Sequence, residues 1–109
     1  MSEKKDILER LSSLLIERKN YAEDNSYTNQ LFSGGNVKIL EKIKEEASEL
    51  IEAGSIEKVI KKEIVHEAAD LWFHTMVLLA FNEINPLEIL NELERREGVS
   101  GIEEKSRRS

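Results

Sequence analysis

The hydrophobic residues of this chain recur every three or four positions, which is the spacing of amphipathic helices. No strand alternation, internal repeat or low-complexity segment stands out. We therefore expect an all-α fold, a bundle of four to five helices in one domain over residues 1–109. The expected helices cover residues 3–19, 26–33, 37–53, 56–82 and 86–97. The polar segment 99–109 is expected to be a flexible tail.

Short polar residues that can cap a helix precede three of these segments, and glycines follow two of them. The caps are Ser26, Asn36 and Ser55, and the glycines are Gly34-Gly35 and Gly54. Asn85-Pro86 is a strong start signal for the last helix, which is expected to turn Leu87, Leu90 and Leu93 inward.

The segment 56–82 is the longest and most apolar of the five. From Ala68 onward, apolar residues such as Trp72 and Phe73 occupy nearly all of its faces. A helix of this kind has to be enclosed by several others, and a small chain offers too few of them. We therefore expect a homodimer in which a subunit interface completes the bundle.

An acidic cluster interrupts the apolar stripe of this same segment. At about 100° per residue, Glu63, Glu67, Asp70 and His74 share one face. The apolar residues of that face are Ile56, Val59, Ile60, Val77, Leu78 and Phe81. Carboxylates on a buried face repel one another and are costly to desolvate unless a cation neutralises them. Oxygen ligands without sulfur favour Mg²⁺ or Mn²⁺, and Mg²⁺ is the cofactor that we expect.

A second acidic string, Glu45-Glu46-Ala47-Ser48-Glu49, lies in the preceding helix. Glu46 falls at the edge of the apolar stripe, Glu49 lies further round, and Glu45 points more toward solvent. In a chain with 35% charged residues, such a string taken alone is commonly plain surface. Combined with the buried cluster, it predicts Glu46, Glu49, Glu67 and Asp70 as metal ligands.

The two histidines suggest further sites. His66-Glu67-Ala68-Ala69-Asp70 is similar to the zinc-protease motif but lacks its second histidine. Glu63 and His66 form one Glu-x-x-His unit of the kind that di-iron bundles use twice, so only a dimer could supply the second. His74 is expected to support Asp70 from outside the ligand set, or to be a satisfied interior histidine.

Metal-assisted hydrolysis of a phosphate compound is the chemistry that remains, because no covalent nucleophile and no glycine-rich phosphate loop are recognisable. Cations that could meet phosphate are Lys38, Lys42, Arg95 and Arg96. Lys42 could equally pair with Glu46 one turn later, and the two arginines also suit the end of a helix.

Composition and charge exclude several other classes. The net charge of −6 argues against nucleic acid as a partner, and the absence of cysteine excludes disulfides and thiolate metal sites. No signal-peptide pattern is present, and the apolar run from Leu71 to Phe81 is too short to span a bilayer. We expect a soluble cytoplasmic protein that does not bind a membrane.

The order of the acids, EExxE on one helix and ExxD on the next, resembles the all-α nucleoside triphosphate pyrophosphohydrolase superfamily. The flanking sequences are similar to those of the phosphoribosyl-ATP pyrophosphatase family of histidine biosynthesis. These stretches are Ser26-Tyr27-Thr28, Ile39-Leu40-Glu41-Lys42-Ile43, Glu67-Ala68-Ala69-Asp70-Leu71-Trp72-Phe73-His74 and Glu92-Leu93-Glu94-Arg95-Arg96. The resemblance covers residues 26 to about 97 in order.

The resemblance implies Mg²⁺-dependent hydrolysis of phosphoribosyl-ATP to phosphoribosyl-AMP and pyrophosphate by a cytoplasmic homodimer. The acids implied to act in catalysis are Glu45, Glu46, Glu49, Glu67 and Asp70. The residues implied to meet substrate are Ser26, Tyr27, Thr28, Lys42 and Arg95. Lys44 departs from the family pattern, in which glycine is frequent, but it projects away from the acids.

Two alternatives stay open at this point. One is a house-cleaning pyrophosphohydrolase with the same metal chemistry and another nucleoside triphosphate as substrate. The other is a non-catalytic helical dimer or partner-binding module whose acids are only surface charge.

Overall fold

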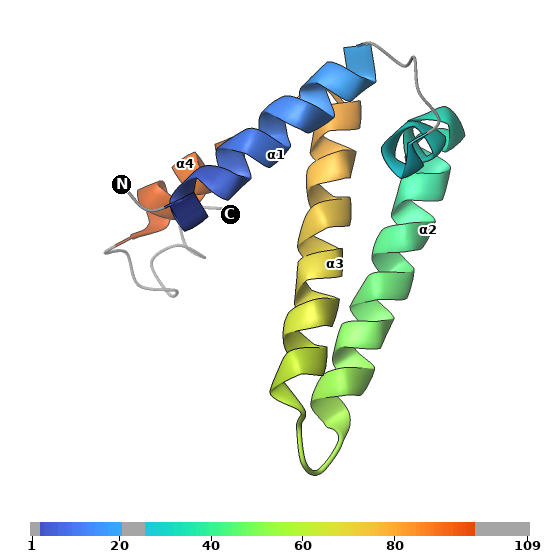
Figure 1. Cartoon of the computed structure of the whole chain (residues 1–109), viewed down its shortest axis with the longest axis vertical. Coiled ribbons are helices and arrows are strands. Elements are labelled where there is room, and N and C mark those ends of the chain that lie inside the picture. The colour runs from blue at the N-terminus through green and yellow to red at the C-terminus, as the bar shows by residue number, and fades with distance from the viewer. Residues whose placement is uncertain (1–2, 21–25, 98–109) are drawn as a thin grey trace, which may run out of the picture.

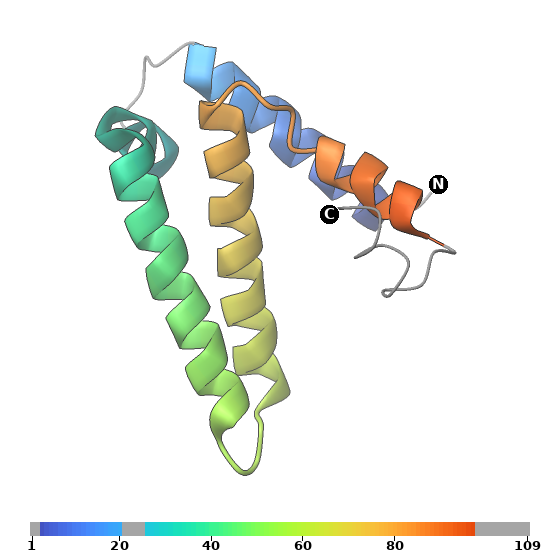
Figure 2. The same cartoon turned by 180° about the vertical axis from the view of Figure 1, so that it is seen from behind.

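The computed structural model describes residues 3–20 and 26–97, and these residues form helices and short connections without a strand. The helices are α1 (Glu3–Asn20), α2 (Tyr27–Ser55), α3 (Lys61–Phe81) and α4 (Glu88–Arg96). Figures 1 and 2 show α2 and α3 as a long antiparallel hairpin, with α1 against one end of α3 and α4 beside α1. The all-α prediction is confirmed, and the predicted tail 99–109 lies outside the described residues.

The predicted helices 26–33 and 37–53 are two parts of α2, which bends at Gly35. Ser26 caps the first part as predicted, because its Oγ accepts a hydrogen bond from the Asn29 backbone N–H at 3.2 Å. Gly35 has φ 69° and ψ −168°, a conformation that is essentially restricted to glycine. The bend turns the first part of α2 across the end of the hairpin (Figure 1).

The predicted helix 56–82 begins too early, and this prediction was wrong at its N-terminal end. Ser55 does not cap α3; it is the last residue of α2, and its Oγ donates to the Ile51 carbonyl at 2.6 Å. Ile56 and Ile60 have extended backbones, so residues 56–60 form the turn between the antiparallel helices. The apolar residues of this turn, Ile56, Val59 and Ile60, are exposed and do not continue the face of α3.

The buried core joins α1, α2 and α3 near the end of the hairpin that lies away from this turn. Its members are Leu15, Leu31, Ile39, Met76, Val77 and Ala80. The rings of Phe32 and Phe81 stack beside it with centroids 6.1 Å apart. Because the core fixes α2 against α3 at one end, residues further along the hairpin face one another in a defined register.

The last helix starts at Glu88, after a turn in which the Asn85 Oδ1 accepts from the Leu87 backbone N–H at 2.9 Å. The prediction that Leu90 and Leu93 point inward was wrong for the single chain, because both are exposed. They border an apolar groove of about 430 Å³ between α1, α3 and α4, together with Trp72.

Helix α3 is the one helix within residues 3–20 and 26–97 that is long and apolar enough, by length and composition, to cross a membrane. It packs against α1 and α2, which is also the position of a central helix in a bundle. Only 22% of its apolar window is buried within the chain, and Trp72 is 63% exposed. The predicted interface that would cover this helix stays a prediction.

We predict that Gly35→Ala lowers the free energy of unfolding by about 1–3 kcal/mol, because a Cβ strains this backbone conformation. The nearest side-chain atom to that Cβ, Phe81 Cζ, is 3.8 Å away, so the effect is conformational and not steric. Urea denaturation measures it. Gly54→Ala is the matched control, since Gly54 lies in α2 with open space around it and should gain a few tenths to about 1 kcal/mol. Equal changes in the free energy of unfolding of the two variants would contradict the claim that the bend requires glycine at position 35.

Candidate metal centre

Four carboxylates meet between α2 and α3. Glu46 and Glu49 come from α2, and Glu67 and Asp70 come from α3, each pair spaced by three residues on one helix face. One oxygen atom of each lies within 4.8 Å of an oxygen of the other three. These are the four residues that the sequence predicted as metal ligands. We call them the four-acid cluster.

Burial and mutual repulsion disfavour the charged state of this cluster. Glu46 is 7% exposed. Burial, followed by the hydrogen bond and the charge of Glu49, raises the pKa of Glu46 to about 7. The hydrogen bond that protonated Glu67 shares with Glu49, followed by burial, raises the pKa of Glu67. The isolated protein therefore holds negative charge where it is poorly solvated.

Two oxygens of the cluster have no hydrogen-bond donor among residues 3–20 and 26–97. Glu46 Oε2 and Glu67 Oε2 are buried without a partner, which is rare for polar atoms in folded proteins. A divalent cation would satisfy both lone pairs and neutralise the repulsion. Because every ligand atom is a carboxylate oxygen, the donor set fits Mg²⁺ or Mn²⁺.

Glu45 lies outside the four-acid cluster. It is exposed, and its Oε2 is 3.5 Å from the Nζ of Lys42. Lys42 therefore pairs with Glu45 at i+3 and not with Glu46 at i+4. The Tyr27 hydroxyl and then Glu45 raise the pKa of Lys42, so this ammonium group stays charged beside the acids.

His74 is buried and has partners at both ring nitrogens. Its Nδ1 donates to the Asp70 backbone carbonyl at 2.8 Å, which fixes the tautomer, so Nε2 accepts from the Tyr27 hydroxyl at 2.8 Å. The prediction of a satisfied interior histidine is confirmed. The expected support of Asp70 reaches its backbone and not its carboxylate.

Of the predicted substrate residues Ser26, Tyr27 and Thr28, Tyr27 is the one whose side chain reaches the neighbourhood of the cluster. The hydroxyl of Tyr27 reaches His74, one turn after Asp70. Burial raises the pKa of Tyr27, Lys42 lowers it, and Glu46 on α2 and Asp70 on α3 raise it further, so charges on both helices of the cluster act on Tyr27. Thr28 is buried, and the Ser26 hydroxyl caps the helix.

Arg95 is not brought to the cluster within this chain. It lies on α4, which Figure 1 shows beside α1 and away from α2. Its Nε and one terminal nitrogen donate to the Glu92 carboxylate at 3.0 and 2.7 Å. Hydrogen bonds from Arg95 and then Arg96 lower the pKa of Glu92 to about 2.

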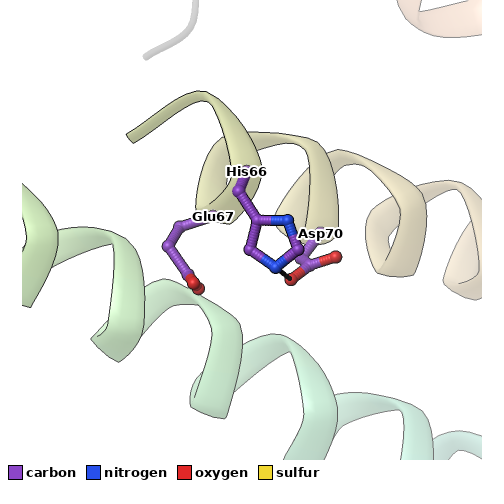
Figure 3. Close-up of side chains that lie close together, drawn as sticks. All are labelled: His66, Glu67 and Asp70. Atoms are coloured by element: carbon purple, nitrogen blue, oxygen red, sulfur yellow. Dashed lines mark ion pairs between the residues drawn. The ribbon is translucent and has the colours of Figure 1, made fainter. Parts of the chain in front are cut away.

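His66 also lies near the cluster, where the sequence suggested it only as part of a zinc-protease-like string or of a Glu-x-x-His unit, and not as a partner of Asp70. Its Nε2 lies 3.3 Å from Asp70 Oδ2, as Figure 3 shows, while Glu67 reaches toward α2. The spacing of four residues from Asp70 was the available signal. Beside it opens a pocket of about 670 Å³ near the interhelical turn. The residues that line this pocket are Glu49, Glu52, Ala53, Ile56, Lys62, Glu63, His66 and Glu67.

Comparison with known proteins places the chain in a family. A family model described as phosphoribosyl-ATP pyrophosphohydrolase matches residues 8–97, which include the whole four-acid cluster. The phosphoribosyl-ATP pyrophosphatase of Geobacter metallireducens is 49% identical over 99% of this chain and 97% of its own length. That of Geobacter sulfurreducens is 47% identical over 100% of this chain and 99% of its own length. That of Ruthia magnifica is 46% identical over 95% of this chain and 97% of its own length. This chain therefore belongs to the phosphoribosyl-ATP pyrophosphohydrolase family.

Proposed function

We propose that this chain hydrolyses phosphoribosyl-ATP to phosphoribosyl-AMP and pyrophosphate, a step of histidine biosynthesis, with Mg²⁺ as cofactor. The observation that carries the proposal is the four-acid cluster with its two unpartnered buried oxygens, in a chain of this family. A protein whose acids were only surface charge would have no reason to bury Glu46 among three other carboxylates.

The cluster would hold the cation through Glu46, Glu49, Glu67 and Asp70. When bound, Mg²⁺ would supply positive charge against the phosphate oxygens of the substrate. Glu45 is the acid of the EExxE string that lies outside the cluster, and it is exposed at its edge. We assign it to accept a proton from the water that attacks phosphorus as the bond between the α- and β-phosphates breaks.

Lys42 and Tyr27 would form the cationic and polar wall of the substrate site. In the part of the chain that the structure describes, the ion-pair partner of Lys42 is the exposed carboxylate of Glu45, which a phosphate oxygen of the substrate can replace. The Tyr27 hydroxyl proton is donated to His74, which leaves its oxygen as an acceptor toward the ammonium group. With Lys42 and Tyr27 in these roles, the phosphates of the substrate would lie beside the α2 side of the cluster.

A homodimer in the cytoplasm is the assembly that we propose for this enzyme. The apolar groove between α1, α3 and α4 is bordered by exposed Trp72, Leu90 and Leu93, and a second subunit would remove these side chains from water. The same contact would bury the open face of α3, because most of the apolar window of this helix is exposed in the single chain.

The direct test is pyrophosphate release by the purified protein from phosphoribosyl-ATP, ATP and dUTP, with Mg²⁺ and with a chelator. We expect release from phosphoribosyl-ATP alone, and only with Mg²⁺. Release from ATP or dUTP instead would keep the metal chemistry and reassign the substrate. No release from any of the three, by folded protein, would contradict an enzymatic role.

Carboxylate variants separate cation binding from proton transfer. Glu67→Gln and Asp70→Asn should lose both Mg²⁺ binding by calorimetry and turnover, the latter by about 100-fold or more. Glu45→Gln should lose turnover but retain the Mg²⁺ affinity of the unmodified protein. All three should keep the helical circular dichroism spectrum, because removing like charge relieves repulsion.

The control for this series is Glu57→Gln, the same chemical change in the exposed turn between α2 and α3. It should alter neither Mg²⁺ binding nor turnover. Unfolding of Glu67→Gln or Asp70→Asn would show that these acids are structural, and unchanged turnover in Glu45→Gln would remove Glu45 from the mechanism.

A further inference from the structure

His74 is a buried histidine to which the proposed function gives no role. The residue is only 4% exposed, and its ring meets the Phe73 ring edge-to-face with centroids 5.3 Å apart. It meets the Tyr27 ring in the same way, with centroids 5.9 Å apart. Nδ1 and Nε2 each lie 2.8 Å from a hydrogen-bond partner. The imidazole is therefore held in one orientation between α3 and the first turn of α2.

The partners of this ring determine the direction of each hydrogen bond. The backbone carbonyl of Asp70 can only accept, so Nδ1 carries the proton of the neutral ring. Nε2 then has a lone pair and no proton, and it accepts the proton of the Tyr27 hydroxyl. Because a phenol has a single proton, the Tyr27 oxygen keeps only lone pairs for a further partner. It can accept another hydrogen bond but cannot donate one.

The Tyr27 oxygen lies beside the four-acid cluster, on a residue that is open to solution. Tyr27 is 45% exposed, although its hydroxyl is bonded to a buried partner one turn after Asp70. Within residues 3–20 and 26–97, the bond to His74 is the one hydrogen bond of this hydroxyl. Besides burial, charges on both α2 and α3 act on the pKa of Tyr27. A bound substrate can therefore reach an acceptor that the chain itself does not use.

A phosphate group is a poor partner for such an oxygen. Phosphate oxygens are negatively charged acceptors, so the lone pairs of Tyr27 and the nearby carboxylates repel them. The proposed substrate also carries neutral hydrogen-bond donors, which are the hydroxyl groups of its two riboses. A ribose hydroxyl can donate to the phenol oxygen without placing further negative charge beside the acids.

We propose that His74 is a positioning residue for substrate recognition, which acts through Tyr27. By accepting the phenol proton, His74 makes Tyr27 a pure acceptor that binds a ribose hydroxyl of the substrate, while Lys42 and the cation meet the phosphates. The inference rests on the proposed function, because the ribose belongs to the proposed substrate. Its consequence is that the Tyr27–His74 pair selects a sugar phosphate over a simple polyphosphate.

Steady-state kinetics separate this role from the chemical step. Tyr27→Phe removes the hydroxyl and keeps the ring, and His74→Asn keeps an N–H near the position of Nδ1 but is too short to reach Tyr27. Each should raise KM for phosphoribosyl-ATP about 3- to 10-fold and leave kcat within about twofold, because one hydrogen bond of uniform binding is lost. His74→Gln, whose longer side chain offers an oxygen to Tyr27, should restore most of the affinity. The double variant should lose no more than either single variant, because both break the same bond.

Asn36→Ala is the matched control for a loosening of the two helices. It breaks another side-chain hydrogen bond between α2 and the end of α3, from Asn82 Nδ2 to Asn36 Oδ1 at 3.0 Å. An equal rise of KM in Asn36→Ala would overturn the inference, since the bond between Tyr27 and His74 would then only hold the helices together. A loss of kcat or of Mg²⁺ affinity in His74→Asn, with KM unchanged, would also overturn it, since His74 would then act through Asp70.

Calorimetry with Mg²⁺ present identifies the group that Tyr27 binds. Tyr27→Phe should weaken the binding of AMP or of ribose 5-phosphate about 3- to 10-fold, and the ligand affected distinguishes the two riboses of the substrate. The binding of inorganic tripolyphosphate should stay unchanged. Equal weakening of tripolyphosphate would overturn the inference, because Tyr27 would then act on phosphate through Lys42. Unchanged binding of both sugar phosphates would overturn it as well.

The outcome is separable from that of the proposed function. Mg²⁺-dependent turnover of phosphoribosyl-ATP, with the same KM in Tyr27→Phe as in the unmodified protein, would keep the function and discard the role of His74. Weaker binding of a sugar phosphate in both Tyr27→Phe and His74→Asn, in a protein without hydrolytic activity, would keep the pair as a recognition site and discard the function.

Discussion

Repulsion among four carboxylates is the constraint on which the rest of this structure depends. Glu46, Glu49, Glu67 and Asp70 are held between two helices where water cannot fully solvate them, and the raised pKa values of Glu46 and Glu67 express this cost. Hydrophobic packing at the far end of the hairpin supplies the opposing force. The core of Leu31, Ile39, Met76 and Val77 keeps α2 and α3 in register although the acids repel each other.

The bend at Gly35 connects this core with the substrate side of the centre. It turns the first part of α2 across the hairpin, where the Tyr27 hydroxyl donates to His74. The two rings also meet edge-to-face, with their centroids 5.9 Å apart. His74 in turn donates to the Asp70 backbone. One chain of hydrogen bonds therefore runs from the N-terminus of α2, through His74, to the backbone of a proposed metal ligand.

The sequence was sufficient for the features that depend on local chemistry. The spacing of the acids predicted the four-acid cluster, and Ser26 was correctly identified as a cap. The sequence was insufficient for features that depend on how the helices pack against one another. Residues 56–60 continue the apolar spacing of a helix, yet antiparallel packing requires a turn there. The break at Gly34-Gly35 was predicted correctly, but the glycines do not determine the angle at which the two parts of α2 meet. The distance of Arg95 from the cluster depends on where α4 packs, and the local sequence of α4 does not predict that position.

Thermal unfolding of the unmodified protein and of Glu46→Gln tests the central claim most directly. Because the folded-state pKa of Glu46, about 7, lies above its ordinary value of 4.5, stability from this group falls as pH rises between those values. With a chelator at pH 8, Glu46→Gln should unfold several degrees above the unmodified protein, and the difference should vanish near pH 5. With Mg²⁺ at pH 8 the order should reverse, since only the complete cluster gains from the cation. The same order with and without Mg²⁺ would contradict a cation site built by these four acids.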